Sequence, residues 1–307
     1  DFADGYAGIQ TGDLPRFVRM FWEVPDVDGT KWAYYQGTVE ANREWGGLEK
    51  GLLGEGGKGS LHNYVAERLG GSVGAWIRGT HCVGKVGVSV SQMGQLPVAL
   101  YSGARFDPSN AVVLPRNPDD LPAIWQFCRS TEFSAAVRSI DQSLKVTNAT
   151  LVKVPFDIDR WRKVAAEEGP LSLPSSEDPT QWVFKGRPET SSKPLQVAVA
   201  RLLGYRWPEQ VQSDDIDPLA DADGIVCLPS VAGEPPAADR LQQLLGAAFR
   251  SSWSPAKNTE LLEEAGTKKK NLADWLRDDF FKQHCALFGH RPFIWHVWDG
   301  QSDGFAA

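Results

Sequence analysis

Long apolar runs and targeting signals are missing from this chain. None of its 307 residues falls in an apolar run of about 18, the length that a membrane-spanning helix requires, so no membrane partner is expected. No secretory signal pattern opens the sequence. The chain starts without Met and ends without a terminal signal, so we expect a piece of a longer, cytoplasmic protein.

Cysteine is scarce and widely spaced. The four cysteines form no C-x-x-C pair, which predicts reduced, buried thiols rather than a disulfide framework. They are Cys82, Cys128, Cys227 and Cys285. His284, His290 and His296 lie near the last of them, but their spacing matches no zinc finger and the segment between them is apolar. No metal site is therefore predicted.

The sequence also lacks the patterns that carry catalysis. No G-x-S-x-G elbow and no paired His, Cys and Asp constellation occurs. Residues 54–59 form a G-x-G-x-x-G, but they follow no convincing strand, and Lys58 is followed by glycine rather than Ser or Thr. Neither a dinucleotide site nor a P-loop is therefore predicted. We expect this chain to catalyse nothing on its own.

Positive charge is in deficit, but unevenly. The formal net charge is −7, yet residues 1–165 hold 18 Lys and Arg against 18 Asp and Glu. Residues 166–307 hold 14 against 21, so any nucleic-acid contact is expected in the first half. No broad basic face is evident there. This fits a module that reads bases while another domain supplies phosphate affinity, and it equally fits no DNA binding.

Hydrophobic periodicity predicts an α+β fold. Alternating patterns predict strands at 32–35, 85–91, 98–101 and 111–114, and strand-like segments at 22–24, 145–156 and 291–298. Helical spacing and caps predict helices at 60–69, at 119–128 and 131–144 with caps at Asp119 and Thr131, at 195–203, at 239–249 and after Asn271. Asp13 is expected to cap a short helix with Pro15 in its first turn.

A shift in composition predicts two domains. Residues 167–181 are rich in Pro, Ser and acidic side chains, which is typical of a linker. We therefore expect a mixed, strand-rich domain with bracing helices at 1–166 and a mainly helical domain at 182–307.

Three stretches of the sequence point in one direction. The first sets Gly8 and Gly12 around a short polar run and continues through Arg16. The second spans 141–156, and the third comprises 271–281 and 290–300. In this order they resemble the target-recognition and C-terminal region of large N6-adenine DNA methyltransferases, of the type IIG restriction–modification and BREX phage-defence kind.

The resemblance implies a reading domain without its catalytic machinery. Methyltransferases of this kind hold a flipped adenine with an Asn/Asp-Pro-Pro-aromatic motif. Here Asn117-Pro118 continues into Asp119, and the only Pro-Pro pair follows Glu234. The resemblance implies double-stranded DNA and a catalytic domain of the same polypeptide as partners, in the bacterial cytoplasm. S-adenosylmethionine is implied for that parent enzyme, with no cofactor in this chain, and a fused nuclease remains an open alternative.

Polar side chains on the expected strands and loops are the candidate DNA contacts. Arginine can bond guanine through two hydrogen bonds, and Gln or Asn can bond adenine in the same way. The DNA-binding candidates are Gln10, Thr11, Arg16, Lys85, Ser89, Ser91, Gln92, Tyr101, Ser102, Arg105, Asn148 and Lys153. A solvated strand face is the simpler alternative for those on strands. For Asn148 it is a plain turn or strand-end role.

Two other classes of function remain as alternatives. Twelve Trp and an acidic balance suit a non-catalytic carbohydrate- or protein-binding domain that uses exposed Trp and Tyr. However, Trp125, Trp275 and Trp295 lie in apolar periodic stretches, which predicts that they pack in the core. A row of exposed Trp along a groove would favour this class. An independent hydrolase is disfavoured by the missing constellations.

Overall fold

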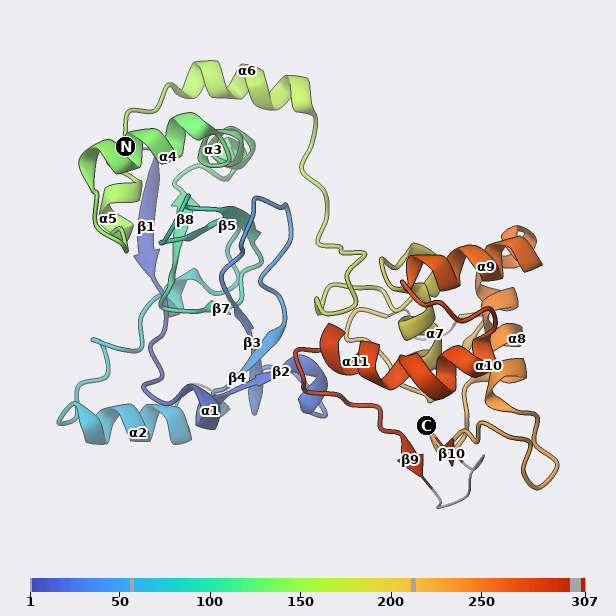
Figure 1. Cartoon of the computed structure of the whole chain (residues 1–307). Coiled ribbons are helices and arrows are strands. Elements are labelled where there is room, and N and C mark those ends of the chain that lie inside the picture. The colour runs from blue at the N-terminus through green and yellow to red at the C-terminus, as the bar shows by residue number, and fades with distance from the viewer. Residues whose placement is uncertain (1, 56–57, 211–213, 299–304, 307) are drawn as a thin grey trace. The chain divides into compact units, whose positions relative to one another are not determined.

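The computed structural model describes residues 2–55, 58–210, 214–298 and 305–306. It divides into two compact units, Asp1–Ser175 and Ser176–Ala307, here called unit 1 and unit 2. The division falls within the segment predicted as a linker. Helices and antiparallel or mixed sheets are both present, so the fold is α+β as predicted (Figure 1).

Unit 1 contains two four-stranded sheets. Sheet 1 has the order β1-β8-β5-β6 and is antiparallel throughout. Its strands are β1 (Ala3–Ala7), β8 (Asn110–Pro115), β5 (Gly87–Ser91) and β6 (Val98–Tyr101). Sheet 2 has the order β2-β4-β3-β7, in which only the last pair is parallel. Its strands are β2 (Val18–Met20), β4 (Lys50–Leu53), β3 (Trp32–Gln36) and β7 (Arg105–Phe106).

Helices brace one face of sheet 1. They are α3 (Leu121–Cys128), α4 (Thr131–Ile140), α5 (Asn148–Leu151) and α6 (Ile158–Glu168). Val88 and Val90 of β5 and Val113 of β8 share a core with Trp125 and Phe133 of these helices. The opposite face of the sheet is also covered, by a cluster that includes Cys82 and Tyr101. All five residues of β5 are therefore buried.

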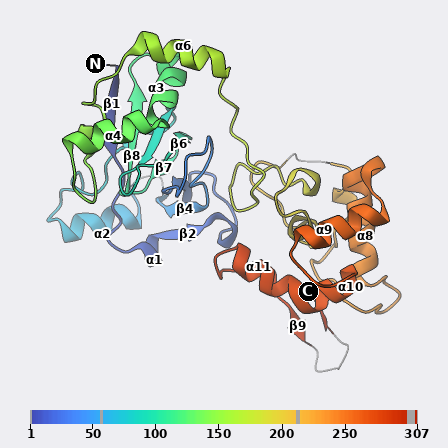
Figure 2. The ribbon, with the colours of Figure 1, turned by 45° about the horizontal axis from the view of Figure 1, so that its top comes forward.

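Sheet 2 packs on a different pair of helices. They are α1 (Leu14–Phe17) and α2 (Ser60–Arg68), which lie side by side in both views of the ribbon (Figures 1 and 2). Phe17, Tyr35 and Val65 are fully buried in their common core. Gln36 is also fully buried. Its Nε2 donates to the carbonyl of Leu100 at 2.9 Å, which ties sheet 2 to sheet 1.

Unit 2 is mainly helical among its described residues. Its helices are α7 (Pro194–Leu202), α8 (Ala237–Phe249), α9 (Pro255–Glu264), α10 (Leu272–Trp275) and α11 (Phe281–Leu287), with a π-helical turn at Leu276–Phe280 between the last two. Two short strands, β9 (Val297–Trp298) and β10 (Phe305–Ala306), form an antiparallel pair. Asn271 caps α10 as predicted, because its side chain accepts from the backbone N–H of Asp274 at 2.8 Å.

Several local predictions are wrong. Residues 22–24 do not form a strand, because Phe21–Glu23 is a 3-10 turn in which Glu23 accepts from the backbone N–H of Met20. Residues 145–156 contain the one-turn helix α5, because the Thr147 side chain caps it by accepting from the N–H of Thr150. In 291–298, only Val297–Trp298 is a strand.

The predicted caps of α3 and α4 are displaced. Asn117, rather than Asp119, caps the 3-10 turn that leads into α3. Ser130, rather than Thr131, caps α4, which ends at Ile140. By contrast, Asp13 caps α1 as predicted, with its carboxylate accepting from the N–H of Arg16 at 3.2 Å. The caps lie one or two residues from the predicted positions because several neighbouring side chains here can cap.

Candidate nucleic-acid interface

The loop at residues 8–12, directly after β1, is held by hydrogen bonds to three other segments. The N–H of Ile9 donates to the carbonyl of Phe106 at 2.8 Å, and the N–H of Gln10 donates to that of Trp76 at 2.9 Å. The buried hydroxyl of Tyr35 donates to the carbonyl of Ile9 at 2.8 Å. Three partners far apart in the sequence therefore hold the backbone on either side of the half-exposed Gln10 side chain.

Both glycines of this loop are required by close contacts. A Cβ on Gly8 would stand 2.3 Å from the carbonyl oxygen of Asp107. Gly12 has a φ of +73°, and a Cβ there would stand 2.4 Å from the Trp76 ring. The predicted tight glycine loop is therefore present, and its two glycines pack against Asp107 and Trp76.

Two arginines stack on one tyrosine beside this loop. The guanidinium of Arg16, on α1, lies 5.0 Å from the centroid of the Phe17 ring and 5.2 Å from that of Tyr64. The guanidinium of Arg68, one turn beyond Tyr64 on α2, lies 4.9 Å from the same tyrosine. Both arginines are exposed. Cation–π contact holds the two guanidinium groups while leaving their N–H donors accessible.

The two sequence segments that carry these arginines hold an excess of cations. Residues 8–20 and 60–86 hold two carboxylates, Asp13 and Glu67. The same segments hold the five cations Arg16, Arg19, Arg68, Arg78 and Lys85. Among the described residues, none of these five forms an ion pair, whereas Asp13 is occupied as a helix cap. We call these five residues the cationic set.

Five of the predicted DNA contacts are buried. Thr11, Ser89, Ser91, Gln92 and Tyr101 expose 5% or less of their surface. The Ser91 hydroxyl donates to the carbonyl of Val39 at 3.1 Å, and Gln92 Nε2 donates to that of Val146 at 2.7 Å. The Tyr101 hydroxyl bonds the carbonyl of Ala104. Placing these residues on a DNA-facing surface was wrong. Both faces of sheet 1 are covered around Ser89, Ser91 and Tyr101, and Thr11 lies in the loop that is hydrogen-bonded to three other segments.

Two further candidates are committed to internal hydrogen bonds. The Ser102 hydroxyl donates to Gln36 Oε1 at 3.2 Å, and Asn148 Nδ2 donates to the carbonyl of Gly5 at 2.6 Å. Asn148 therefore fastens the helix α5 to β1, a structural role that differs from the expected turn or strand end. Lys153 is exposed. Arg105 is half-buried, and burial lowers the pKa of its guanidinium.

Gln10, Arg16, Lys85, Arg105 and Lys153 therefore keep side chains that solvent reaches. Arg19, Tyr64, Arg68 and Arg78, in the two segments of the cationic set, were not among the predicted contacts. Tyr64 and Arg68 are spaced i, i+4 on the expected helix at 60–69, and this spacing places two side chains on one helix face. That signal was available in the sequence.

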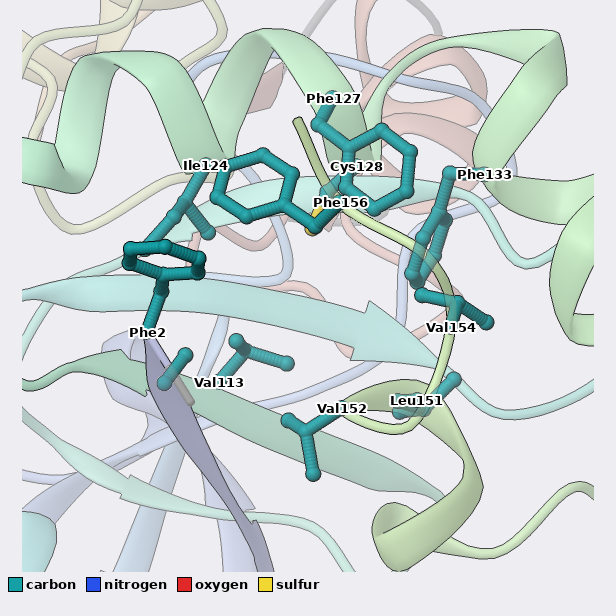
Figure 3. Close-up of a pocket in the computed structure, with 11 residues that line it drawn as sticks. Phe2, Val113, Ile124, Phe127, Cys128, Phe133, Leu151, Val152, Val154 and Phe156 are labelled. Carbon is teal, nitrogen blue, oxygen red and sulfur yellow. The ribbon is translucent and has the colours of Figure 1, made fainter. Parts of the chain in front are cut away.

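The cavity between sheet 1 and its helices offers no polar chemistry (Figure 3). It measures about 120 Å³ and is lined by apolar side chains that include Phe2, Phe127 and Phe156. Its one thiol belongs to Cys128, and burial raises the pKa of that thiol to about 12. Burial likewise raises the pKa of Cys82 to about 11. Both thiols therefore stay protonated at neutral pH and are not nucleophiles.

Packing explains His284, near the end of the chain. His284 is fully buried, and its Nε2 accepts from the N–H of Ile294 at 3.3 Å. Its Nδ1 lies 3.3 Å from Gln196 Oε1. Burial lowers its pKa to about 4. In the part of the chain that the structure describes, no group of three His, Cys, Asp or Glu side chains is placed to hold a metal ion.

No protein-family model matches this chain, and no curated protein matches it significantly. Within the described ranges, no helix has the length and apolar character needed to cross a bilayer.

Tryptophan burial separates the two leading interpretations. Six tryptophans are at least nine-tenths buried: Trp22, Trp125, Trp161, Trp182, Trp207 and Trp275. Of the tryptophan side chains that the structure describes, only Trp295 is largely exposed, at 61%, contrary to the prediction that it packs in the core. It borders an apolar groove of about 500 Å³ with Tyr205 and Phe293. A single exposed tryptophan is not the row that a carbohydrate-binding surface of that kind needs.

Proposed function

We propose that this chain is the sequence-specific, double-stranded DNA recognition region of a bacterial adenine-specific DNA methyltransferase that serves restriction–modification or phage defence. In this proposal the catalytic domain of the same polypeptide binds S-adenosylmethionine and takes the flipped adenine, in the bacterial cytoplasm. This chain supplies the contacts that select the site.

The unpaired cationic set of unit 1 is the observation that supports the proposal most. Arginine and lysine without carboxylate partners are free to neutralise phosphates, and this neutralisation provides most of the sequence-independent affinity for DNA. Arg16 and Arg68 suit this role best, because Tyr64 holds both guanidinium groups at the surface.

Base reading is assigned to the side chains beside the cationic set that remain accessible. The Gln10 amide has a donor and an acceptor that match the major-groove edge of adenine. Because the loop backbone is tied at Ile9 and Gln10, little backbone conformational entropy is lost when this side chain binds. Arg105 is the corresponding candidate for guanine.

Selection from a randomised duplex pool at about 50 and 200 mM salt tests the proposal. An enriched motif that persists at the higher salt is the expected result. Gln10→Ala and Arg105→Ala should each relax one position of that motif, by about 1–3 kcal/mol for each lost two-bond contact. Failure of the chain to bind or enrich any duplex at either salt would contradict the proposal.

A carbohydrate or protein ligand is the second candidate, favoured only by the groove beside Trp295 in unit 2. Quenching of tryptophan fluorescence by a glycan panel, abolished by Trp295→Ala, would support it. DNA binding that is unaffected by Trp295→Ala is the outcome that our proposal expects.

A further inference from the structure

A four-residue tip in unit 1 exposes two valines to solvent. It consists of Val83, Gly84, Lys85 and Val86, all of which are exposed. Val83 exposes 47% and Val86 exposes 52% of its surface. Valine is among the residue types that are most often fully buried, so two exposed valines within four residues offer an apolar area that a partner can cover.

The tip is held firmly at both ends. Before it, Cys82 is fully buried in the cluster that covers sheet 1, and after it, Gly87 begins the buried strand β5. The N–H of Gly84 donates to the carbonyl of Gly103 at 2.8 Å, and the N–H of Lys85 donates to that of Cys82 at 3.0 Å. The two exposed valines therefore lie on a turn whose backbone is fixed by hydrogen bonds.

One residue of the tip, Lys85, belongs to the cationic set. Lys85 lies between the two valines and has no ion-pair partner among the described residues, and Arg78 precedes it in the same connection. Gly103, which holds the tip, is two residues from Arg105. An apolar pair with unpaired cations beside it suits a partner that is polyanionic and carries small apolar groups.

Duplex DNA presents one such group at its accessible edges, the 5-methyl group of thymine in the major groove. Base faces are stacked and out of reach of a short, branched valine. We propose that Val83 and Val86 contact thymine methyl groups while Lys85 contacts the adjacent phosphate, so that this tip selects thymine in the site. The inference rests on the proposed DNA-recognition function and adds residues and a base to it.

Replacing thymine by deoxyuracil removes only the methyl group and therefore tests the contact directly. The probe is the duplex that the wild-type chain enriches from a randomised pool, prepared with thymine or with deoxyuracil at each enriched thymine. Burial of one methyl group corresponds to about a fourfold change in affinity. We expect the wild-type chain to bind the deoxyuracil duplex about fourfold more weakly for each contacted position.

The Val83→Ser/Val86→Ser variant should bind the thymine and deoxyuracil duplexes equally. Leu144→Ser is the matched control, because Leu144 is 77% exposed in the same unit and outside the tip, and it should keep the full methyl effect. Circular dichroism and thermal unfolding of the three proteins check that all are folded.

Each result has one meaning. Equal binding of the two duplexes by the wild-type chain would overturn the thymine contact and leave the proposed function standing. A methyl effect that persists in the double-serine variant would overturn the assignment to the tip. Absence of binding to every duplex would overturn the proposed function and this inference together.

Discussion

The two units differ in what their cations do. Ion pairs between described residues engage at least nine of the 14 Lys and Arg of unit 2. In unit 1 the corresponding number is three of 18. Unit 2 therefore uses its positive charge to neutralise its own carboxylates, whereas most of the cations in unit 1 have no carboxylate partner among the described residues. Net charge alone conceals this difference.

Arg201 illustrates the internal use of charge in unit 2. Its side chain is 2% exposed, and it bonds Asp214 at 2.8 Å and Asp217 at 2.6 Å. It also donates to the carbonyl of Gly186 at 2.7 Å. A buried charge with this many partners fixes the surrounding loop, because removal of one partner leaves the others desolvated and unpaired.

Arg201→Ala should produce the largest effect on stability, a loss of about 3–5 kcal/mol in the free energy of unfolding. Chemical denaturation monitored by hydrogen exchange in unit 2 measures it. Arg250→Ala is the control, because Arg250 and its partner Asp215 are each 64% exposed and such pairs contribute at most about 1 kcal/mol. Equal losses in the two variants would contradict the contrast between buried and surface pairs.

Gly12→Ala should cost about 1–3 kcal/mol and weaken DNA binding, since the new Cβ meets both a positive φ and the Trp76 ring. Thermal unfolding and duplex affinity are the two measurements. Gly74→Ala is the matched control in the facing segment, because a Cβ there meets nothing within 4 Å. If both variants retain affinity, the opening loop has no role in binding.

A fall in pH should lower the stability of unit 2. Burial raises the pKa of Asp221, but hydrogen bonds, that from Arg240 foremost, outweigh it and hold the pKa at about 2. Hydrogen bonds from Arg277 and Lys269 hold the pKa of Asp278 at about 2 as well. Such carboxylates stabilise the fold above their unfolded pKa of about 4, and this contribution is lost as the pH falls towards 2.

Hydrogen exchange across pH 5 to about 2 should therefore show loss of protection around Asp221 and Asp278 over this window. Asp221→Asn should flatten the dependence near the first site. If protection stays unchanged between pH 5 and pH 3 and the unit then unfolds uniformly, Asp221 and Asp278 are not the source of the pH dependence.

The elements with strong periodicity were predictable from the sequence, and the surface was not. The stripe through Trp125 and Cys128 predicts α3, and the alternation at 85–91 predicts β5, because burial of one face leaves a regular pattern. Whether β5 is covered on its second face depends on residues outside the strand, among them Phe106 and Val112. Ser89 and Ser91 were therefore assigned to an exposed face in error.

The candidate site was only partly predictable for the same physical reason. Asp13 and Arg16 follow from local capping rules, so the opening loop and α1 were recognised. The Tyr64–Arg68 pair follows from the i, i+4 spacing on α2, but the stacking of Arg16 on Tyr64 joins segments about 50 residues apart, and no local rule brings those together. The 145–156 segment was misassigned because a threonine cap overrides a weak alternation over one turn.

The central claim is that the unpaired arginines of unit 1 contact DNA phosphates. The salt dependence of duplex affinity in the Arg16→Ala/Arg68→Ala variant tests this claim most directly. The control is Arg116→Ala/Arg160→Ala, which removes two arginines of unit 1 that are already paired. If the unpaired arginines contact phosphates, the slope of log affinity against log salt should become shallower by about 2 in the first variant and stay unchanged in the control. Equal slopes for the wild-type chain and both variants would contradict the account.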